Sequence, residues 1–543
     1  MDREHQLRKP VFARSALKRR QRVLALGILL ALGVAGALVL ILIGCGGDNS
    51  STPSTTVPIA PVQPLQIADV QNIVQAAVNS ANVDMVVAVV DRAGFVLGVF
   101  RTQNAPATAI GNFGQALDAN DVALALARTG AFFSNDQAPL SSRTVRFISG
   151  IHFPPGVTNQ PPADLYGIEN TNRGCTLVSG ATFQSQIPPS LALGGGFGPG
   201  VMTGKADAMD SNPLAVNPGG VPIFYQNVVV GGMGVVTSSS NLNLAEYVAF
   251  AGSSTQRTGP GDSFGPTPAA PGVVFIGGIA LPFVTQTSLP DGVSAGPVAG
   301  TGSYVVAPAN SAGQPPDGDL IAPAAGPLGG LSATDVQTIL SNAEATANTT
   351  RAAIRLPIGS RARMAIAVAD LDGTIIGLRR MQDSTVFSID VAASKARNMV
   401  YFNSSSRTAA DLNQVPMGKA VTNRTISFGA QPFFPPGIDG TAPGPFFNIF
   451  LQDLANPCTQ GMQAGAPNVN KSGIVFFPGS TGLFRNGVLV GGLGVSGDGV
   501  DQDDYVTNGG AAGFEAPANI RADQILINDV RLPYFKFPRN PTD

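Results

Sequence analysis

The sequence predicts an α+β fold that occurs twice in the chain, each copy with an antiparallel sheet packed by helices. Two observations support this prediction. Segments of the first half match segments of the second half in the same order, and both halves run helix, hairpin, helix, hairpin. The composition agrees, because 44% apolar residues suffice for globular cores while 65 Gly and 43 Pro indicate many turns and long connections.

The internal duplication is visible in ungapped matches. Residues 85–101 align with 364–380, and residues 143–157 align with 424–438. We therefore predict two repeats that superpose, repeat 1 at residues 65–285 and repeat 2 at residues 331–543. The positions expected to coincide are Asp91 with Asp370, Arg101 with Arg380, Arg143 with Arg424, and Gly232 with Gly492.

Each repeat opens with a helix and a hairpin. Apolar residues at helical spacing predict helices at 67–78 and 331–345, and Ser332 or Thr334 is a candidate cap for the second. In repeat 1, β-rich runs at 85–90 and 95–100 flank a tight turn that begins at Asp91 and ends at Gly94.

A second helix and a second hairpin follow in both repeats. Ala-rich stretches with an acidic first turn predict helices at 121–133 and 390–402. The dipeptides Gln226-Asn227 and Asn486-Gly487 predict the turns of hairpins at 221–231 and 482–492.

Residues 1–44 are predicted to direct export. Residues 1–22 carry eight Lys/Arg against two acidic residues, and the uncharged residues 23–43 are long enough to cross a bilayer. Leu42-Ile43-Gly44-Cys45 resembles a lipoprotein signal peptide with Cys45 as the lipidated residue, and an uncleaved transmembrane anchor is the alternative. Both interpretations place the body in the cell envelope, membrane-anchored and facing the periplasm or the cell surface. Residues 45–64 are then a flexible tether, and residues 286–330 a Gly/Pro-rich linker.

Charge and cysteine content exclude several function classes. The net charge of −2 combines +6 in residues 1–22 with −8 in the rest, so nucleic acid is not an expected partner. The sequence has no Walker loop, CxxC or CxxCH, which excludes covalent c-type haem and argues against dithiol chemistry. Whether Cys175 and Cys458 pair stays open, although they occupy comparable places in the two repeats.

Repeat 2 contains four segments in a characteristic order: AVADLDG (367–373), RMQD (380–383), SIDVAASKAR (388–397) and RNGVLVGGLGVSG (485–497), the last followed by QDD at 502–504. Through these segments repeat 2 resembles the GlcG/HbpS-like haem-binding, or haem-degrading, family. Repeat 1 has diverged, since Leu126 stands where repeat 2 has Lys395, and both repeats carry long insertions at 158–217 and 439–472. The resemblance implies a profilin-like fold, self-association as an intramolecular pseudo-dimer or a homo-oligomer, and a haem or other small-molecule ligand.

Five residues are candidates for holding that ligand. His152, the one histidine outside the N-terminal tail, is a candidate axial ligand of haem iron, although an ordinary loop role is the simpler interpretation. Arg101, Arg380, Arg143 and Arg424 are candidates for pairing with haem propionates, against the simpler interpretation of structural salt bridges.

Two further patterns are explained better by structure than by chemistry. Residues 492–497 satisfy G-x-G-x-x-G, but the carboxylates that follow would repel a pyrophosphate, so glycines that make room for a helix are favoured. The Asp-rich run at 498–504 lacks the spacing of a calcium-binding EF-hand, which favours a polar loop and an acidic first helical turn.

Three functions remain in view. The first is an exported, membrane-anchored binding protein for haem or a similar planar ligand, acting in scavenging or sensing. The second is a structural or surface-interaction protein whose ligand site has been lost. The third is an enzyme acting on haem or a small organic acid, which the shortage of His and Cys disfavours.

Overall fold

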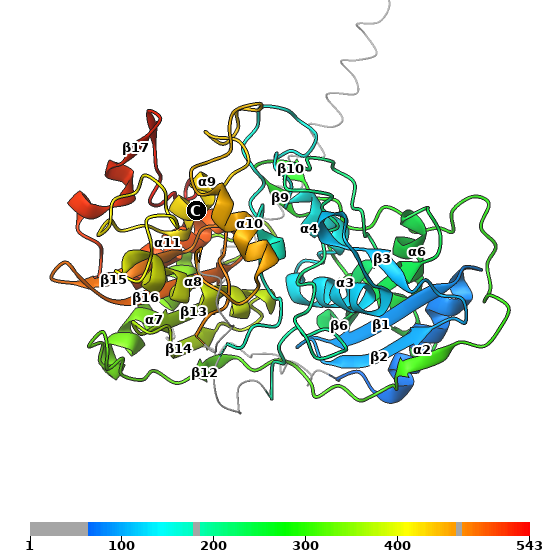
Figure 1. Cartoon of the computed structure of the whole chain (residues 1–543). Helices are drawn as coiled ribbons and strands as arrows, with labels where there is room; N and C mark the ends of the chain where they lie inside the picture. The colour runs from blue at the N-terminus through cyan, green and yellow to red at the C-terminus, as the bar shows by residue number, and fades with distance from the viewer. Residues whose placement is uncertain (1–62, 178–184, 463–469, 543) are drawn as a thin grey trace, which may run out of the picture. The chain divides into compact units, whose positions relative to one another are not determined.

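Repeat 1 is built around a five-stranded antiparallel sheet in the computed structural model, which describes residues 63–177, 185–462 and 470–542 (Figure 1). The strands are β1 (Met85–Asp91), β2 (Val96–Arg101), β5 (Gly220–Tyr225), β6 (Val228–Thr237) and β11 (Ser303–Val306). Their order across the sheet is β11-β2-β1-β6-β5, so both predicted hairpins belong to one sheet.

Repeat 2 contains a second sheet with the same topology. Its strands are β12 (Gly318–Ile321), β13 (Met364–Ala369), β14 (Ile375–Arg380), β15 (Ser480–Arg485) and β16 (Val488–Gly497). The order β12-β14-β13-β16-β15 reproduces that of repeat 1 strand for strand. The predicted α+β fold class, with antiparallel sheets packed by helices and interrupted by long insertions, is confirmed.

The strand registers agree as closely as the topologies. Val86 pairs with Arg101 as Ala365 pairs with Arg380. Val90 pairs with Gly232 as Ala369 pairs with Gly492, which places Asp91 and Asp370 one residue later at the same position. These predicted correspondences are therefore found in the backbone pairing itself.

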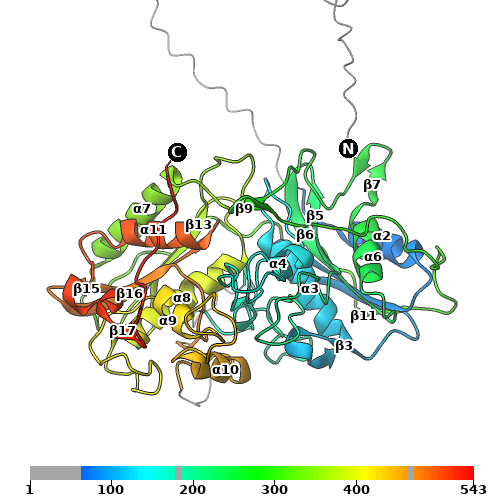
Figure 2. The same ribbon diagram turned by 90° about the horizontal axis from the view of Figure 1, so that it is seen from above.

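Helices cover both faces of each sheet. In repeat 1, α3 (Ala119–Phe133) lies on one face, and α2 (Ile67–Ser80) and α6 (Asn243–Ser253) lie on the other (Figure 2). In repeat 2, α8 (Phe387–Asn403) takes the place of α3, and α7 (Ala333–Thr349) and α11 (Val500–Gly510) take the places of α2 and α6. Ser332 caps α7 as predicted, since its hydroxyl accepts a hydrogen bond from the amide of Asp335.

Glycines let α3 and α8 lie directly on the sheets. A Cβ added at Gly232 or Gly234 of β6 would collide with the carbonyl oxygens of Ala127 and Ala123 in α3. Gly492 and Gly494 meet α8 in the same way. The G-x-G-x-x-G pattern is therefore a packing feature, as predicted.

The segment predicted as a linker contributes to both sheets. It supplies β11, which pairs with β2, and β12, which pairs with β14. Between these strands the Ser311 hydroxyl donates to the Asp91 carboxylate, and Gln314 donates to the carbonyl of Val229. Composition alone missed the strands because they are short and lie at sheet edges, where Gly and Pro are tolerated.

Shorter elements complete both repeats. Helices α4 (Ser142–Phe147) and α9 (Asn423–Gly429) are equivalent, while α10 (Phe447–Ala455) belongs to the second insertion. Four small hairpins are β3 (Thr108–Ile110) with β4 (Ala116–Asp118), β7 (Gln256–Gly259) with β8 (Asp262–Ser263), β9 (Phe275–Ile276) with β10 (Ile279–Ala280), and β17 (Leu526–Ile527) with β18 (Val530–Arg531). Single 3-10 turns occur at Asn112–Gly114, Ile168–Asn170, Ala518–Ile520 and Ala522–Gln524.

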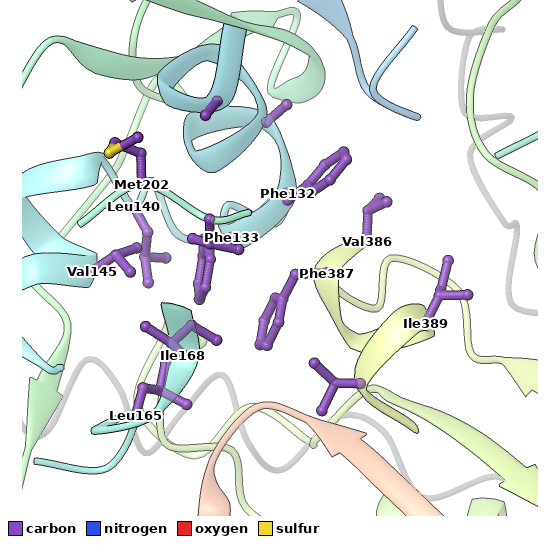
Figure 3. Close-up of a cluster of buried hydrophobic side chains, with 14 of the residues drawn as sticks. Phe132, Phe133, Leu140, Val145, Leu165, Ile168, Met202, Val386, Phe387 and Ile389 are labelled. Atoms are coloured by element: carbon purple, nitrogen blue, oxygen red, sulfur yellow. The ribbon is translucent and has the colours of Figure 1, made fainter. Parts of the chain in front are cut away.

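The two repeats share a core and a covalent bond. Cys175 and Cys458 form a disulfide with Cα atoms 5.4 Å apart, which joins the two insertions. The rings of Phe133 and Phe387 stack with centroids 4.2 Å apart in a cluster that draws residues from both repeats (Figure 3).

This contact joins non-equivalent helix ends, because Phe133 ends α3 whereas Phe387 begins α8. A twofold arrangement also allows such a contact, so the predicted pseudo-symmetric pairing stays a prediction. Phe402, the counterpart of Phe133, packs in a separate cluster with residues of the second insertion such as Phe446 and Phe450.

None of the helices in the described ranges combines the length and apolar character that a bilayer crossing requires. The predicted basic tail, apolar segment and Cys45 lie outside the described residues.

Candidate functional site

The family-like motifs of repeat 2 converge where β16 ends and α11 begins. Lys395 of α8 is buried, and its Nζ donates to the carbonyl of Val495 at 2.7 Å and to Asp503 Oδ2 at 2.9 Å. The same Nζ lies 4.9 Å from the ring centroid of Phe477. Burial lowers the pKa of Lys395 and raises the pKa of Asp503 to about 7, so each group needs the other as its partner.

Repeat 1 has an apolar pair at this position. A Cβ added at Gly479 would meet Asp503 and Lys395, and one added at the equivalent Gly219 would meet Ala245. Leu126, the counterpart of Lys395, is likewise buried. Both partners of the ion pair are therefore replaced together in repeat 1.

Arg143 and Arg424 make the same connection in their repeats. Arg143 Nε and Nη2 donate to the two carboxylate oxygens of Glu246 in α6, at 2.6 and 3.0 Å. Arg424 donates to Asp504 and, at 2.6 Å, to Asp501, both in α11. Glu246 and Asp504 also accept backbone amides of the segment that follows the last hairpin of each repeat. Both arginines thus tie three segments of the fold together.

Arg101 and Arg380 are held mainly by backbone carbonyls. Arg101 donates to the carbonyls of Ala105 and Pro106, both at 3.0 Å. Arg380 is buried and donates to Ser384 and Pro315, and it pairs with Asp317. The contacts of Arg380 with Pro315 and Asp317 anchor the segment between the repeats.

His152 lies at a contact between the two insertions. Its Nε2 is 2.7 Å from Asp439 Oδ1, its side chain is 7% exposed, and its buried Nδ1 has no hydrogen-bond partner among the residues that the structure describes. Asp439 is also bound by the backbone amide of Asn159 at 3.0 Å. The predicted ligand roles of His152 and the four arginines stay predictions, and the structure shows that each already has an internal partner.

A cleft of about 800 Å³ lies between the repeats and touches none of those five residues. One wall is the β9–β10 hairpin of repeat 1, and the others are the 351–358 loop, the start of α11 and the 536–539 segment of repeat 2. We call it the interrepeat cleft. Its apolar lining is Val274, Phe275, Ile276, Leu356, Ile358 and Val500.

The mouth of the interrepeat cleft is basic. Arg351, Arg355, Lys536 and Arg539 line it, against the carboxylates of Asp164 and Asp501. Arg355 is committed to Asp498 and Asp383, at 2.8 and 2.5 Å. Lys536 pairs with Asp501 at 2.8 Å, but its side chain is 67% exposed. With the exposed Arg539 and the half-buried Arg351, it remains within reach of an anionic ligand.

A small recess adjoins the cleft and shares Asp164, Ile276 and Val500 with it. The recess is also lined by Ser496 and Asp503 of the family-like motifs. Burial and the nearby carboxylate of Asp501 raise the pKa of Asp164 to about 6, partly offset by Lys536 and Arg424. The motif residues therefore lie directly behind the cleft.

The Asp-rich run that opens α11 is used entirely in ion pairs. Asp498 pairs with Arg355, Asp501 with Arg424 and Lys536, and Asp503 with Lys395. Across the described ranges no three His, Cys, Asp or Glu side chains form a metal-binding group. The preference for a polar loop and an acidic first turn over a calcium site is consistent with this arrangement.

Sequence reasoning did not identify Arg351, Lys536 and Arg539. They belong to no motif, and Arg351 and Arg539 are 188 residues apart. Tertiary structure alone brings them together, through the hydrogen bond from Arg351 Nη2 to the Arg539 carbonyl at 3.2 Å.

Comparison with known proteins supports the motif assignment. Residues 331–512 match the family described as haem degrading protein HbpS-like. Two solved structures are similar. Klebsiella pneumoniae protein ORFY is 18% identical, and the match covers 34% of this chain and 90% of that chain with a TM-score of 0.22. A PduOC–haem complex is 22% identical, and the match covers 34% of this chain and 96% of that chain with a TM-score of 0.22. No curated protein matches the chain. The resemblance of repeat 2 to the HbpS-like haem-degrading family is therefore confirmed over residues 331–512.

Proposed function

We propose that this chain is an exported binding protein for haem or a similar planar, anionic ligand, and that the interrepeat cleft holds the ligand. The observation that carries the proposal is the combination of apolar walls and a basic mouth beside the family motifs of repeat 2. The cleft volume of about 800 Å³ lies in the range of small-molecule sites. We also infer that repeat 1 is a diverged family copy, which supplies one wall.

The cleft fits the porphyrin ring and its carboxylates. A ring system would cover apolar side chains that are otherwise solvent-exposed, such as Ile358 at 73% and Phe275 at 42%. Arg351, Lys536 and Arg539 would pair with propionate groups, and arginine suits carboxylates because it binds them in a bidentate manner.

The fit to the iron is a different matter. Among the described residues, the lining contains no His, Cys, Met or Tyr, the usual protein ligands of haem iron. When bound, haem would supply a redox-active iron, but recognition in this cleft would depend on the ring and its carboxylates. His152, the predicted axial ligand, would have to bind from outside the cleft lining and leave Asp439.

Export is supported by the disulfide and by the N-terminal sequence. Disulfides persist in oxidising compartments such as the periplasm and the cell surface, and Cys175 and Cys458 are bonded. The basic tail and apolar segment at residues 1–44, with Cys45 as the proposed lipidation site, would anchor the body to the membrane.

The proposal is tested by titrating the full chain with haemin and recording the visible absorbance spectrum. We expect a saturable shift of the haem absorption band, with affinity reduced about tenfold or more in an Arg351→Glu/Arg539→Glu variant. Arg531→Glu, an exposed charge reversal outside the cleft, is the control and should bind as wild type. An unshifted spectrum with wild-type protein would favour the structural alternative, and progressive loss of the band with reductant and oxygen would favour the enzymatic one.

A further inference from the structure

A second recess of about 380 Å³ lies in repeat 2, outside the interrepeat cleft. Three separate segments form it: the 413–414 loop, the 443–448 segment that leads into α10, and the turn of the β17–β18 hairpin. We call it the amide groove. Its lining residues are Asn413, Gln414, Pro443, Gly444, Pro445, Phe447, Asn448 and Asn528.

The polar lining of the amide groove is neutral. Four of the eight lining residues carry a carboxamide, and none carries a charge. All four carboxamide residues are exposed, and within the described ranges none of their side chains hydrogen-bonds to another protein group. A carboxamide both donates and accepts hydrogen bonds, which is also the capacity of a hydroxyl group. The groove therefore matches a ligand that is rich in hydroxyl groups and carries no charge.

One aromatic ring completes the groove. Phe447 is half-buried, and its ring stacks on Phe450 with centroids 6.0 Å apart and planes at 12°. Phe450 is fully buried and makes an edge contact with Phe476 at 5.0 Å. The Phe447 ring is thus held in place from behind, and a fixed apolar ring next to hydrogen-bonding groups suits the two-sided character of a sugar ring.

Two of the four carboxamide residues have unusual backbone conformations. Gln414 and Asn528 are left-handed, with φ of 68° and 50°, which residues other than glycine adopt rarely.

We propose that the amide groove binds a neutral oligosaccharide. Its lack of charge sets it apart from the basic interrepeat cleft, so the two sites take different ligands, and this inference does not depend on haem binding. Under the export proposed above, the chain would meet such glycans in the cell envelope or on neighbouring cells. Their shared chemistry is a chain of uncharged sugar rings.

The test is a glycan array probed with the full chain, followed by calorimetric titration of the strongest neutral oligosaccharide found. We expect binding to neutral glycans, with affinity changed less than about twofold between about 50 and about 500 mM salt because no charges take part. Array positions with N-acetylated sugars represent glycans of the cell envelope, and positions with plain hexoses represent storage glycans. Comparing the two distinguishes these sources of the ligand.

The matched variants are Asn448→Ala/Asn528→Ala in the groove and Asn508→Ala, an exposed Asn on α11 outside it. The groove variant should lose about tenfold or more in affinity while the control binds as wild type. An array on which no neutral glycan binds, binding confined to anionic glycans, or a groove variant with wild-type affinity would each overturn the proposal. Circular dichroism of the variants separates loss of binding from loss of folding.

Discussion

Repeats 1 and 2 keep the same sheet and the same arginine tie but differ in one buried pair. Repeat 2 has Lys395 of α8 and Asp503 of α11 in contact beside Gly479, and repeat 1 has Leu126 and Ala245 at those places. Arg143 with Glu246 and Arg424 with Asp504 are retained in both. The fold therefore tolerates an apolar pair where repeat 2 keeps a charged one, since packed apolar side chains replace a buried ion pair at little cost.

The difference also follows the position of the candidate site. Asp503 lines the recess behind the interrepeat cleft, whereas neither Leu126 nor Ala245 lines the cleft or that recess. The ion pair of repeat 2 therefore adjoins the candidate site, whereas the apolar pair of repeat 1 occupies the same place in the fold without adjoining it.

The largest effect is expected from breaking the ion pair on one side. Lys395→Leu should lower the free energy of unfolding by about 3–5 kcal/mol, because it leaves the Asp503 carboxylate buried without its cation. The double variant Lys395→Leu/Asp503→Ala installs the pair of repeat 1 and should recover most of the loss. Calorimetric melting of the three proteins measures both values.

A double variant as unstable as the single one would contradict the comparison, because it would mean that repeat 2 needs the charges for folding. Leu126→Ala in repeat 1 provides the scale for a simple cavity at the equivalent position, about 2–5 kcal/mol.

The disulfide should matter less to either sheet than to the contact between the repeats. Cys175→Ser/Cys458→Ser releases a cross-link across 283 residues and should cost about 2–4 kcal/mol. Because the bond joins the two insertions, hydrogen exchange should accelerate around Asn172 and Asp453 while β1 and β13 stay protected. Equal acceleration in both sheets would show that the repeats do not fold independently of this bond.

A smaller effect is expected from pH at the same contact. Asp390 accepts the backbone amide of Asn172 at 2.8 Å, and burial raises its pKa to about 6; Asp453, paired with Arg173, shifts in the same direction. The folded state therefore holds protons that the unfolded chain has released, so this contribution to stability is present below about pH 4 and is lost as pH rises through about 6.

We expect the free energy of unfolding to fall by on the order of 1 kcal/mol for Asp390 between about pH 5 and about pH 7, and the melting temperature to fall with it. Asp390→Asn keeps the shape of the side chain without the titration, so its melting temperature should depend less on pH than that of the wild type. Identical slopes for the two proteins would contradict the assignment.

The sequence predicted the repeated hairpins because their signals are local: alternating apolar residues, turn residues such as Asn486-Gly487, and the glycines of β16. It missed β11 and β12, whose Gly- and Pro-rich surroundings are typical of a linker. Pairing of Cys175 with Cys458 was left open, since no local pattern determines which insertions meet.

The site itself was the harder problem. The sequence shows four arginines that recur in both repeats, namely Arg101, Arg143, Arg380 and Arg424. Such residues recur because both repeats need the same structural contacts. The cleft cations Arg351, Lys536 and Arg539 do not recur and lie in irregular segments, so only the assembled structure brings them together.

The central claim is that the interrepeat cleft recognises the porphyrin ring and its carboxylates. It is tested most directly by measuring the affinities of haemin and of iron-free protoporphyrin IX for the full chain and for His152→Ala. We predict that both ligands bind within about threefold of each other and that His152→Ala leaves both unchanged. Haemin binding about a hundredfold tighter than the iron-free ring, with the difference abolished in His152→Ala, would contradict the claim and identify His152 as the iron ligand.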